Sequence, residues 1–190
     1  MRLLRLFLTA LLVTPGLLGL LAAAKFVSAP TQAVEIVEQE ETIGKPRWLI
    51  IPALGIKADI EHVGLTADGA MDVPKAWENV GWFQGGSKPG EQGNAVIAGH
   101  FDSDTGPAVF WQLQKLEPGD EIRVIDDRNR LHIFHVREKE KLADDATALD
   151  AIFGSTVGTH LNLITCGGVW NEAAQHYEER LAVFAELTNE

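Results

Sequence analysis

The stretch His160–Trp170, HLNLITCGGVW, holds the only cysteine of this 190-residue chain. An apolar run, which predicts a strand, ends at Cys166 and is followed directly by two glycines. Free cysteines are often buried and inert, so one interpretation is a small core residue. The other is a nucleophilic thiol presented where a strand ends. The rest of the chain has to decide between the two.

The N-terminal segment predicts a membrane anchor. Residues 6–24 carry no charge, with Arg2 and Arg5 before them and Lys25 after them. This length just suffices for a transmembrane helix, and the leading arginines favour a cytoplasmic N-terminus. We expect residues 1–27 to form a cytoplasmic tip and a single-pass anchor in the cell membrane, with the rest extracytoplasmic. A cleaved signal peptide is the competing interpretation, and in either case the remainder is exported.

The charge balance limits the kinds of molecule that the domain is expected to bind. Residues 1–25 hold three basic and no acidic side chains, which leaves 13 basic against 27 acidic side chains and a net charge of −14 for the remainder. Such a domain is not expected to bind nucleic acid, whose phosphates demand the opposite field. One cysteine cannot form an internal disulfide, and an unpaired thiol in an exported protein is a candidate reactive group.

Residues 28–45 are polar and acidic, which predicts an extracytoplasmic tether, and residues 46–190 are long enough for one core. Short helices are expected over 109–116 and 144–154. Asp126–Asn129 is a hairpin signature. Many short strands with few helices indicate a mainly β domain, either a closed barrel or a sandwich. Strands are predicted over residues 47–52, 53–63, 94–100, 118–126, 130–140, 161–166 and 179–187, with a turn and a short strand over 67–74.

A thiol needs a basic or positive neighbour to act as a nucleophile, and the chain offers six histidines. His100 ends the apolar run AVIAGH after a glycine, much as Cys166 ends LNLITC before one. Two such strand ends can place both side chains at one rim of a barrel. His160 would lie about 20 Å along the strand from the thiol, and His176 stays a weaker candidate. The others have no special setting: His62, His132 and His135.

Four stretches together resemble the sortases, the membrane-anchored cysteine transpeptidases of Gram-positive bacteria: NAVIAGHFD, VFWQLQKLEPGDEIRV, LNLITCGG and ERLAVFAEL. The resemblance covers about residues 47–188 and implies a closed eight-stranded β-barrel. TCGG is most similar to the actinobacterial class E or class F sortases. The usual Thr-Leu-x-Thr-Cys pattern has Asn162 at its first position here, which leaves subclass and substrate preference open.

The resemblance also implies roles. Cys166 would attack the scissile amide, His100 would exchange protons with the leaving and incoming amines, and Arg180 would stabilise the oxyanion. We further expect four residues to contact the substrate: Thr165, Leu163, Ile97 and Trp170.

The implied reaction cleaves a sorting motif resembling Leu-Pro-x-Thr-Gly through a thioacyl intermediate. It then transfers the surface protein to a cell-wall amine, such as a lipid II-like peptidoglycan precursor. Two alternatives stay open. One is an anchored β-barrel binding module without turnover. The other is an exported cysteine peptidase that only hydrolyses, although those enzymes usually place the cysteine before the histidine in the chain.

No phosphate-binding loop and no zinc-ligand spacing occurs in the sequence, so neither a cofactor nor a metal is expected. The acidic side chains that would suit a calcium ion are two pairs, Asp102 with Asp104 and Asp144 with Asp145.

Overall fold

The computed structural model describes residues 42–143, 146–172 and 176–188. The expected membrane anchor, residues 1–27, and most of the expected tether lie outside these ranges. Within them, no helix is long and apolar enough to cross a membrane. The strands are β1 Pro46–Ile51, β2 Ile56–Val63, β3 Val80–Phe83, β4 Gly93–Gly99, β5 Asp102–Ser103, β6 Gly106–Pro107, β7 Glu121–Asp126, β8 Leu131–Ala143, β9 Thr159–Asn171 and β10 His176–Leu187. The helical elements are η1 Pro52–Leu54, η2 Leu113–Lys115 and α1 Ala146–Phe153.

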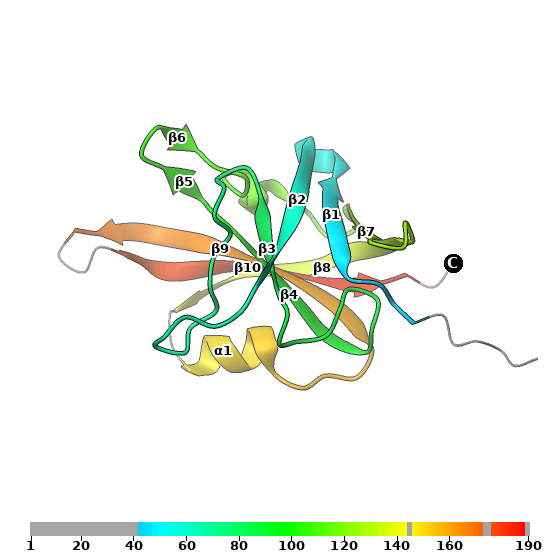
Figure 1. Ribbon diagram of the computed structural model, residues 1–190. Helices are drawn as coiled ribbons and strands as arrows, with labels where there is room; N and C mark the ends of the chain where they lie inside the picture. The colour runs from blue at the N-terminus through cyan, green and yellow to red at the C-terminus, as the bar shows by residue number, and fades with distance from the viewer. Residues whose placement is uncertain (1–41, 144–145, 173–175, 189–190) are drawn as a thin grey trace, which may run out of the picture. The chain divides into compact units, whose positions relative to one another are not determined.

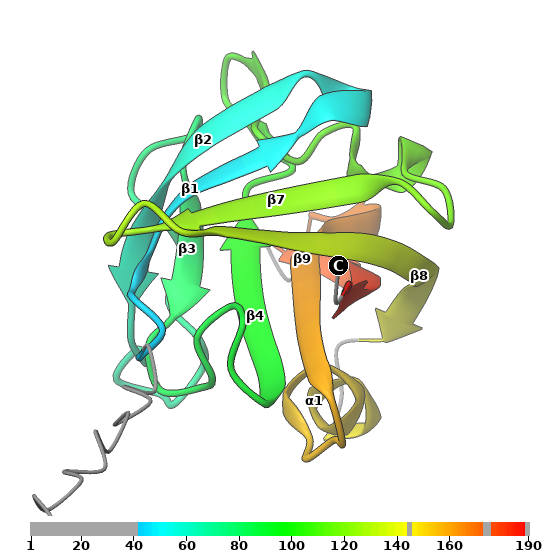
Figure 2. The ribbon, with the colours of Figure 1, turned by 90° about the vertical axis from the view of Figure 1, so that its right-hand side faces the viewer.

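Eight of the strands close into a barrel in the order β1-β2-β3-β4-β9-β10-β8-β7, which confirms the expected mainly β, eight-stranded barrel (Figure 2). Two neighbouring pairs are parallel, β2 with β3 and β4 with β9, and the others are antiparallel. The interior is filled by fully buried apolar side chains from both halves of the chain, including Leu49, Ile97, Phe110, Ile122, Phe134, Leu161 and Leu163.

Alternation along β9 shows why this segment forms a barrel strand. Leu161, Leu163 and Thr165 are buried, whereas Ile164 and Cys166 on the other face are only partly buried. Successive side chains of a strand point to opposite faces, so odd positions fill the barrel and even positions line its outer wall. The cysteine is therefore presented on the outside of the barrel.

Two local expectations were wrong, and one barrel strand was not predicted. The short strand expected within 67–74 is only a single bridge, between Leu65 and Met71. β3 at Val80–Phe83 was not predicted, because it is four residues long and contains Gly81. A Cβ at Gly81 would lie 3.0 Å from Cγ1 of Val63, so glycine lets β3 lie close against β2. The helix expected over 109–116 is reduced to η2.

The predicted hairpin at Asp126–Asn129 is confirmed and joins β7 to β8. Asn129 has a φ of 59°, which asparagine tolerates better than most residues. The buried carboxylate of Asp126 accepts hydrogen bonds from the backbone N–H groups of Gly44, Arg128 and Arg130. Residues 42–45, which the sequence assigned to the end of the tether, are thus already attached to the barrel.

Two features extend beyond the barrel (Figure 1). β9 and β10 run side by side past the ends of the other strands, on the side where the β5–β6 hairpin lies. On another side, α1 covers the outer wall, where its buried Ala148 and Ile152 pack with Val96 and Ala182. These two features border the site described next.

Candidate active site

The site begins where two parallel strands end together. β4 and β9 pair in register up to Ala98 opposite Ile164, and the chain leaves β4 at His100. The hydroxyl of Thr165 donates a 2.8 Å hydrogen bond to the carbonyl of Gly99, and both residues are buried. Because parallel strands end at the same edge, this register brings His100 and Cys166 to one rim, as expected from the sequence.

Arg180 comes from the strand on the other side of β9. It pairs directly with Cys166 in the antiparallel β9–β10 register. Directly opposite residues of an antiparallel pair project to the same face, so the guanidinium and the thiol share the outer wall. Its Nη1 donates to the carbonyls of Tyr177 and Glu179, at 3.1 Å each, which holds the guanidinium against its own strand.

His100, Cys166 and Arg180 all line one groove of about 820 Å³. One wall is the connection between β2 and β3, where Leu65 and Val73 are 60% and 53% exposed. The opposite wall is α1, where Leu149 is 58% exposed. Exposed apolar side chains on both walls of one groove are typical of a binding surface. The rest of the lining is Asp68, Gly69, Ala70, Met71, Phe83, Ala98, Gly99, Ala148, Ile152, Phe153, Ile164 and Thr165.

Of the residues expected to contact substrate, three have side chains that the structure describes, and among these Thr165 alone lines the groove. Ile97 and Leu163 have no exposed surface and lie in the barrel core, so the structure does not support their assignment to substrate. Their outward neighbours Ala98 and Ile164 line the groove instead. Trp170 lies on β9, but its side chain falls outside the described part of the structure.

The ring of His100 is held by two contacts. Its Nε2 lies 2.8 Å from the carbonyl oxygen of Pro74, and its ring lies against Trp77 with the centroids 4.3 Å apart. Both residues belong to the β2–β3 connection. Among the histidine side chains that the structure describes, His100 is the one that lines the groove.

An aromatic corner continues from His100. Phe101 lies 4.5 Å from the ring of Trp111 and 5.7 Å from that of Tyr177. The hydroxyl of Tyr177 donates a 2.6 Å hydrogen bond to Oδ2 of Asp102. This hydrogen bond, together with burial and the nearby charges of Asp102 and Cys166, raises the pKa of Tyr177 to about 12. The start of β10 is thereby joined to the segment that follows His100.

Asn162, which stands where the usual sortase pattern Thr-Leu-x-Thr-Cys has its first threonine, has a structural role in this chain. Its buried Nδ2 donates a 2.7 Å hydrogen bond to the carbonyl of Ile152 in the last turn of α1, and Nδ2 of Asn94 donates a 2.7 Å bond to Gly154 just beyond it. The two amides therefore satisfy carbonyls at the C-terminal end of α1. They fix the helix that forms one wall of the catalytic groove.

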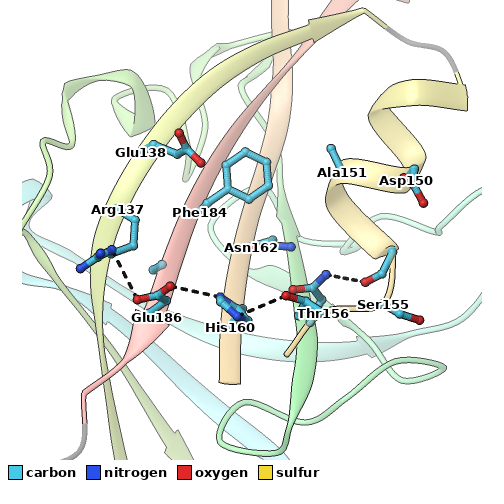
Figure 3. Close-up of a pocket in the computed structure, with 13 residues that line it drawn as sticks. Arg137, Glu138, Asp150, Ala151, Ser155, Thr156, His160, Asn162, Phe184 and Glu186 are labelled. Carbon is cyan, nitrogen blue, oxygen red and sulfur yellow. Dashed lines mark hydrogen bonds and ion pairs between the residues drawn. The ribbon is translucent and has the colours of Figure 1, made fainter. Parts of the chain in front are cut away.

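A second, smaller pocket of about 280 Å³ lies beside Asn162 (Figure 3). His160 lies in it, with Nε2 2.9 Å from the carbonyl of Val157 and Nδ1 4.0 Å from Glu186, which also pairs with Arg137 at 3.4 Å. These contacts account for His160 as a structural residue. It does not line the groove that holds Cys166.

The first acidic pair, Asp102 with Asp104, shows no calcium site. Asp102 is engaged by Tyr177, Asp104 lies on an exposed turn, and Asp144 and Asp145 lie outside the described residues. In the part of the chain that the structure describes, no group of three or more histidine, cysteine or acidic side chains is arranged to hold a metal ion.

A β-barrel that brings a thiol, an imidazole and a guanidinium into one groove defines a cysteine enzyme of acyl transfer. The family model described as the sortase domain matches residues 49–188. The chain therefore belongs to the sortase family of cysteine transpeptidases. A comparison with curated proteins finds no match.

Solved structures agree with this fold. Sortase C-1 from Actinomyces oris superimposes with a TM-score of 0.59 at 22% identity, over 75% of this chain and 73% of that one. The sortase D5 transpeptidase from Clostridium perfringens gives 0.58 at 24%, over 79% and 84%. A lid mutant of Streptococcus agalactiae sortase C1 gives 0.60 at 22%, over 85% and 78%. These are class C and class D enzymes, so they do not establish the class E or class F assignment.

Proposed function

We propose that this sortase cleaves a motif resembling Leu-Pro-x-Thr-Gly in exported proteins and transfers them to a cell-wall amine such as a lipid II-like precursor. The observation that supports the proposal best is the position of Cys166, His100 and Arg180 on three neighbouring strand segments around one apolar-walled groove. A groove with exposed apolar side chains on both walls suits an extended peptide that carries leucine and proline.

The proposed reaction has two halves. The Cys166 thiolate attacks the scissile carbonyl, a C–S bond forms, and His100 as imidazolium gives its proton to the amide nitrogen as the C–N bond breaks. The acceptor amine then attacks the thioester, His100 takes its proton, and the thiolate leaves. Arg180 stabilises the oxyanion in both halves with fixed N–H donors. A guanidinium suits this role because its donors form a rigid fork.

Variants of the three residues test this function. Cys166→Ala should abolish both hydrolysis and transfer, and His100→Ala should cost about a hundredfold or more in rate. Arg180→Lys keeps the charge but loses the fork, and should cost about 10²–10³-fold. The measurement is mass spectrometry of the full-length chain with a peptide library and candidate amines. A folded Cys166→Ala variant that still forms the transfer product would refute the proposal.

Two other functions give different results in the same assay. A hydrolytic peptidase would release acid product only, whatever amine is added. A binding module would retain peptide without forming either product, and its affinity would not change in Cys166→Ala.

We also propose a sortase class for this chain and a position relative to the cell membrane. TCGG at residues 165–168 supports a class E or class F sortase, and placement of this chain among class C sequences in a family tree would overturn that. The uncharged run 6–24 behind two arginines supports a retained anchor with an extracytoplasmic catalytic domain. A mature N-terminus near Lys25 in culture medium would show cleavage instead.

A further inference from the structure

The short segment 74–79, in the connection between β2 and β3, contacts the ring of His100. The carbonyl oxygen of Pro74 lies 2.8 Å from His100 Nε2. A carbonyl can only accept a hydrogen bond, so the ring nitrogen in this contact has to carry the proton. In the neutral ring, the second nitrogen, Nδ1, then has the free lone pair. This one contact selects which nitrogen of His100 is able to exchange a proton.

Trp77 fixes the plane of the same ring. The two ring centroids are 4.3 Å apart and the planes are inclined by 56°. Trp77 is 47% exposed, so the side chain is not a filler of the barrel core. The backbone carbonyl of Trp77 accepts a 3.1 Å hydrogen bond from the backbone N–H of Val109, which fixes the main chain at this residue.

The segment is itself anchored to β2 by one carboxylate. Oε2 of Glu61 accepts from the backbone N–H of Lys75 at 2.9 Å, and Oε1 accepts from the N–H of Ala76 at 3.2 Å and from Nδ2 of Asn79 at 3.0 Å. Burial raises the pKa of Glu61, but these three donors outweigh it, so the pKa lies below its ordinary value. The carboxylate is therefore ionised at neutral pH and keeps the segment in place.

We propose that segment 74–79 is a positioning element for His100. Pro74 holds the neutral ring with its proton on Nε2, Trp77 holds the ring plane, and Glu61 holds the segment. His100 then works through Nδ1: the imidazolium gives the Nδ1 proton to the leaving amine, and neutral Nδ1 takes one from the acceptor amine. The other proton stays on Nε2 of His100 throughout, hydrogen-bonded to the carbonyl of Pro74. This inference rests on the proposed acid–base function of His100.

The tautomer can be measured directly. Two-bond ¹H–¹⁵N correlation spectra of the full-length chain, labelled with ¹⁵N-histidine, distinguish Nε2–H from Nδ1–H in a neutral ring. The signals of His100 are assigned by their loss in His100→Gln. We expect the Nε2–H pattern on the alkaline side of the titration. A dominant Nδ1–H pattern would overturn the inference, whatever the activity.

Kinetics test the positioning. Trp77→Ala should lower kcat about tenfold with little change in KM, because the groove walls that hold the peptide are intact. Trp77→Phe, which keeps an aromatic face, should restore most of the loss. Glu61→Ala, which touches neither His100 nor the groove, should also lower kcat more than it raises KM. Trp48→Ala on β1 is the matched control for losing a partly buried tryptophan and should leave kcat unchanged.

The outcomes separate this inference from the proposed function. If a folded His100→Ala variant keeps full activity, the acid–base assignment itself fails. If His100 is essential but Trp77→Ala has the kcat of the unmutated chain, the positioning inference fails alone. A loss of kcat in Trp77→Ala accompanied by an equal loss in Trp48→Ala would indicate a general effect of stability, and thermal unfolding of each variant identifies that case.

Discussion

A single hydroxyl, that of Thr165, connects the two strand ends that precede His100 and Cys166. The hydrogen bond that it donates to the carbonyl of Gly99 is buried. Gly99 directly precedes His100, and Thr165 directly precedes Cys166. Glycine is required at position 99 because a Cβ there would lie 2.4 Å from the ring of Phe110. The backbone under the site is therefore held by one hydrogen bond and one close contact with a core side chain.

Replacing Thr165 by valine keeps the shape of the side chain and removes the donor. The buried carbonyl of Gly99 is then left without its partner, which typically costs about 1–3 kcal/mol. We expect a loss of that size in the free energy of unfolding, measured by urea denaturation, together with a lower kcat. Thr165→Ser keeps the hydroxyl and is the control. Equal stability of the valine and serine variants would show that the bond contributes nothing.

The residues alone indicated Cys166 and His100, because each ends an apolar strand run beside a glycine, whereas Arg180 was assigned only through the resemblance to the sortases. The substrate contacts were less well predicted. Leu163 lies three positions from Cys166, and odd spacing on a strand puts it on the opposite face. Strict alternation from Cys166 and His100 would have indicated Ile164 and Ala98. The carbonyl of Pro74 could not have been found this way, since a backbone group leaves no signal in side-chain type.

At the scale of elements, the site depends on how β10 is tied to the segment after β4. Tyr177 is the contact point: its hydroxyl donates to Asp102, and its carbonyl accepts from Arg180. One residue thus joins the strand that carries the guanidinium to the chain two residues beyond His100. Strand β3 and the loop contacts of α1 could not be predicted from the hydrophobic pattern of the sequence. Short or irregular segments are stabilised by tertiary neighbours more than by their own periodicity.

Tyr177→Phe removes this hydrogen bond and keeps the ring against Phe101. We expect about 1 kcal/mol less stability, since the pair is only part-buried, and a several-fold loss of kcat/KM. In a double-mutant cycle, adding Asp102→Ala should cost little more, because both changes break the same bond. Fully additive effects would contradict the coupling.

The pH dependence of this bond follows from the raised pKa. The hydroxyl has a pKa of about 12 in the folded chain against an ordinary value of 10. The contribution of the bond is therefore complete below pH 10 and is lost as the pH rises through about 12. Ultraviolet titration of the phenolate, compared with Tyr177→Phe, measures this directly because the chain has one tyrosine.

For the whole molecule, the buried carboxylate of Asp126 contributes to how the stability of the barrel responds to acid. Burial raises its pKa, but donors from Arg130, Gly44, His132 and Arg128 outweigh this and lower the pKa to about 2, from an ordinary 3.8. A lowered pKa means that the ionised carboxylate stabilises the fold above pH 4 and that this contribution is lost as the pH falls toward 2. The shift corresponds to about 2 kcal/mol.

Acid denaturation should show this contribution. Unfolding followed by circular dichroism should give a stability that falls between pH 4 and pH 2, and Asp126→Asn should be less stable at pH 7 with a weaker pH dependence in that window. Asp127→Asn, at the exposed neighbouring position, is the matched control. An unchanged acid transition in Asp126→Asn would place the acid-sensitive group elsewhere.

The barrel consists of two halves in sequence, strands β1 to β4 and strands β7 to β10. These halves meet along two seams, where β1 pairs with β7 and β4 pairs with β9. His100 belongs to the first half, whereas Cys166 and Arg180 belong to the second, and the seam between β4 and β9 runs between them. Arg180 follows His100 by 80 residues, so β10 has to be in place before the thiol, the imidazole and the guanidinium can all line the groove. The groove is therefore complete only when both halves of the barrel have paired along β4 and β9.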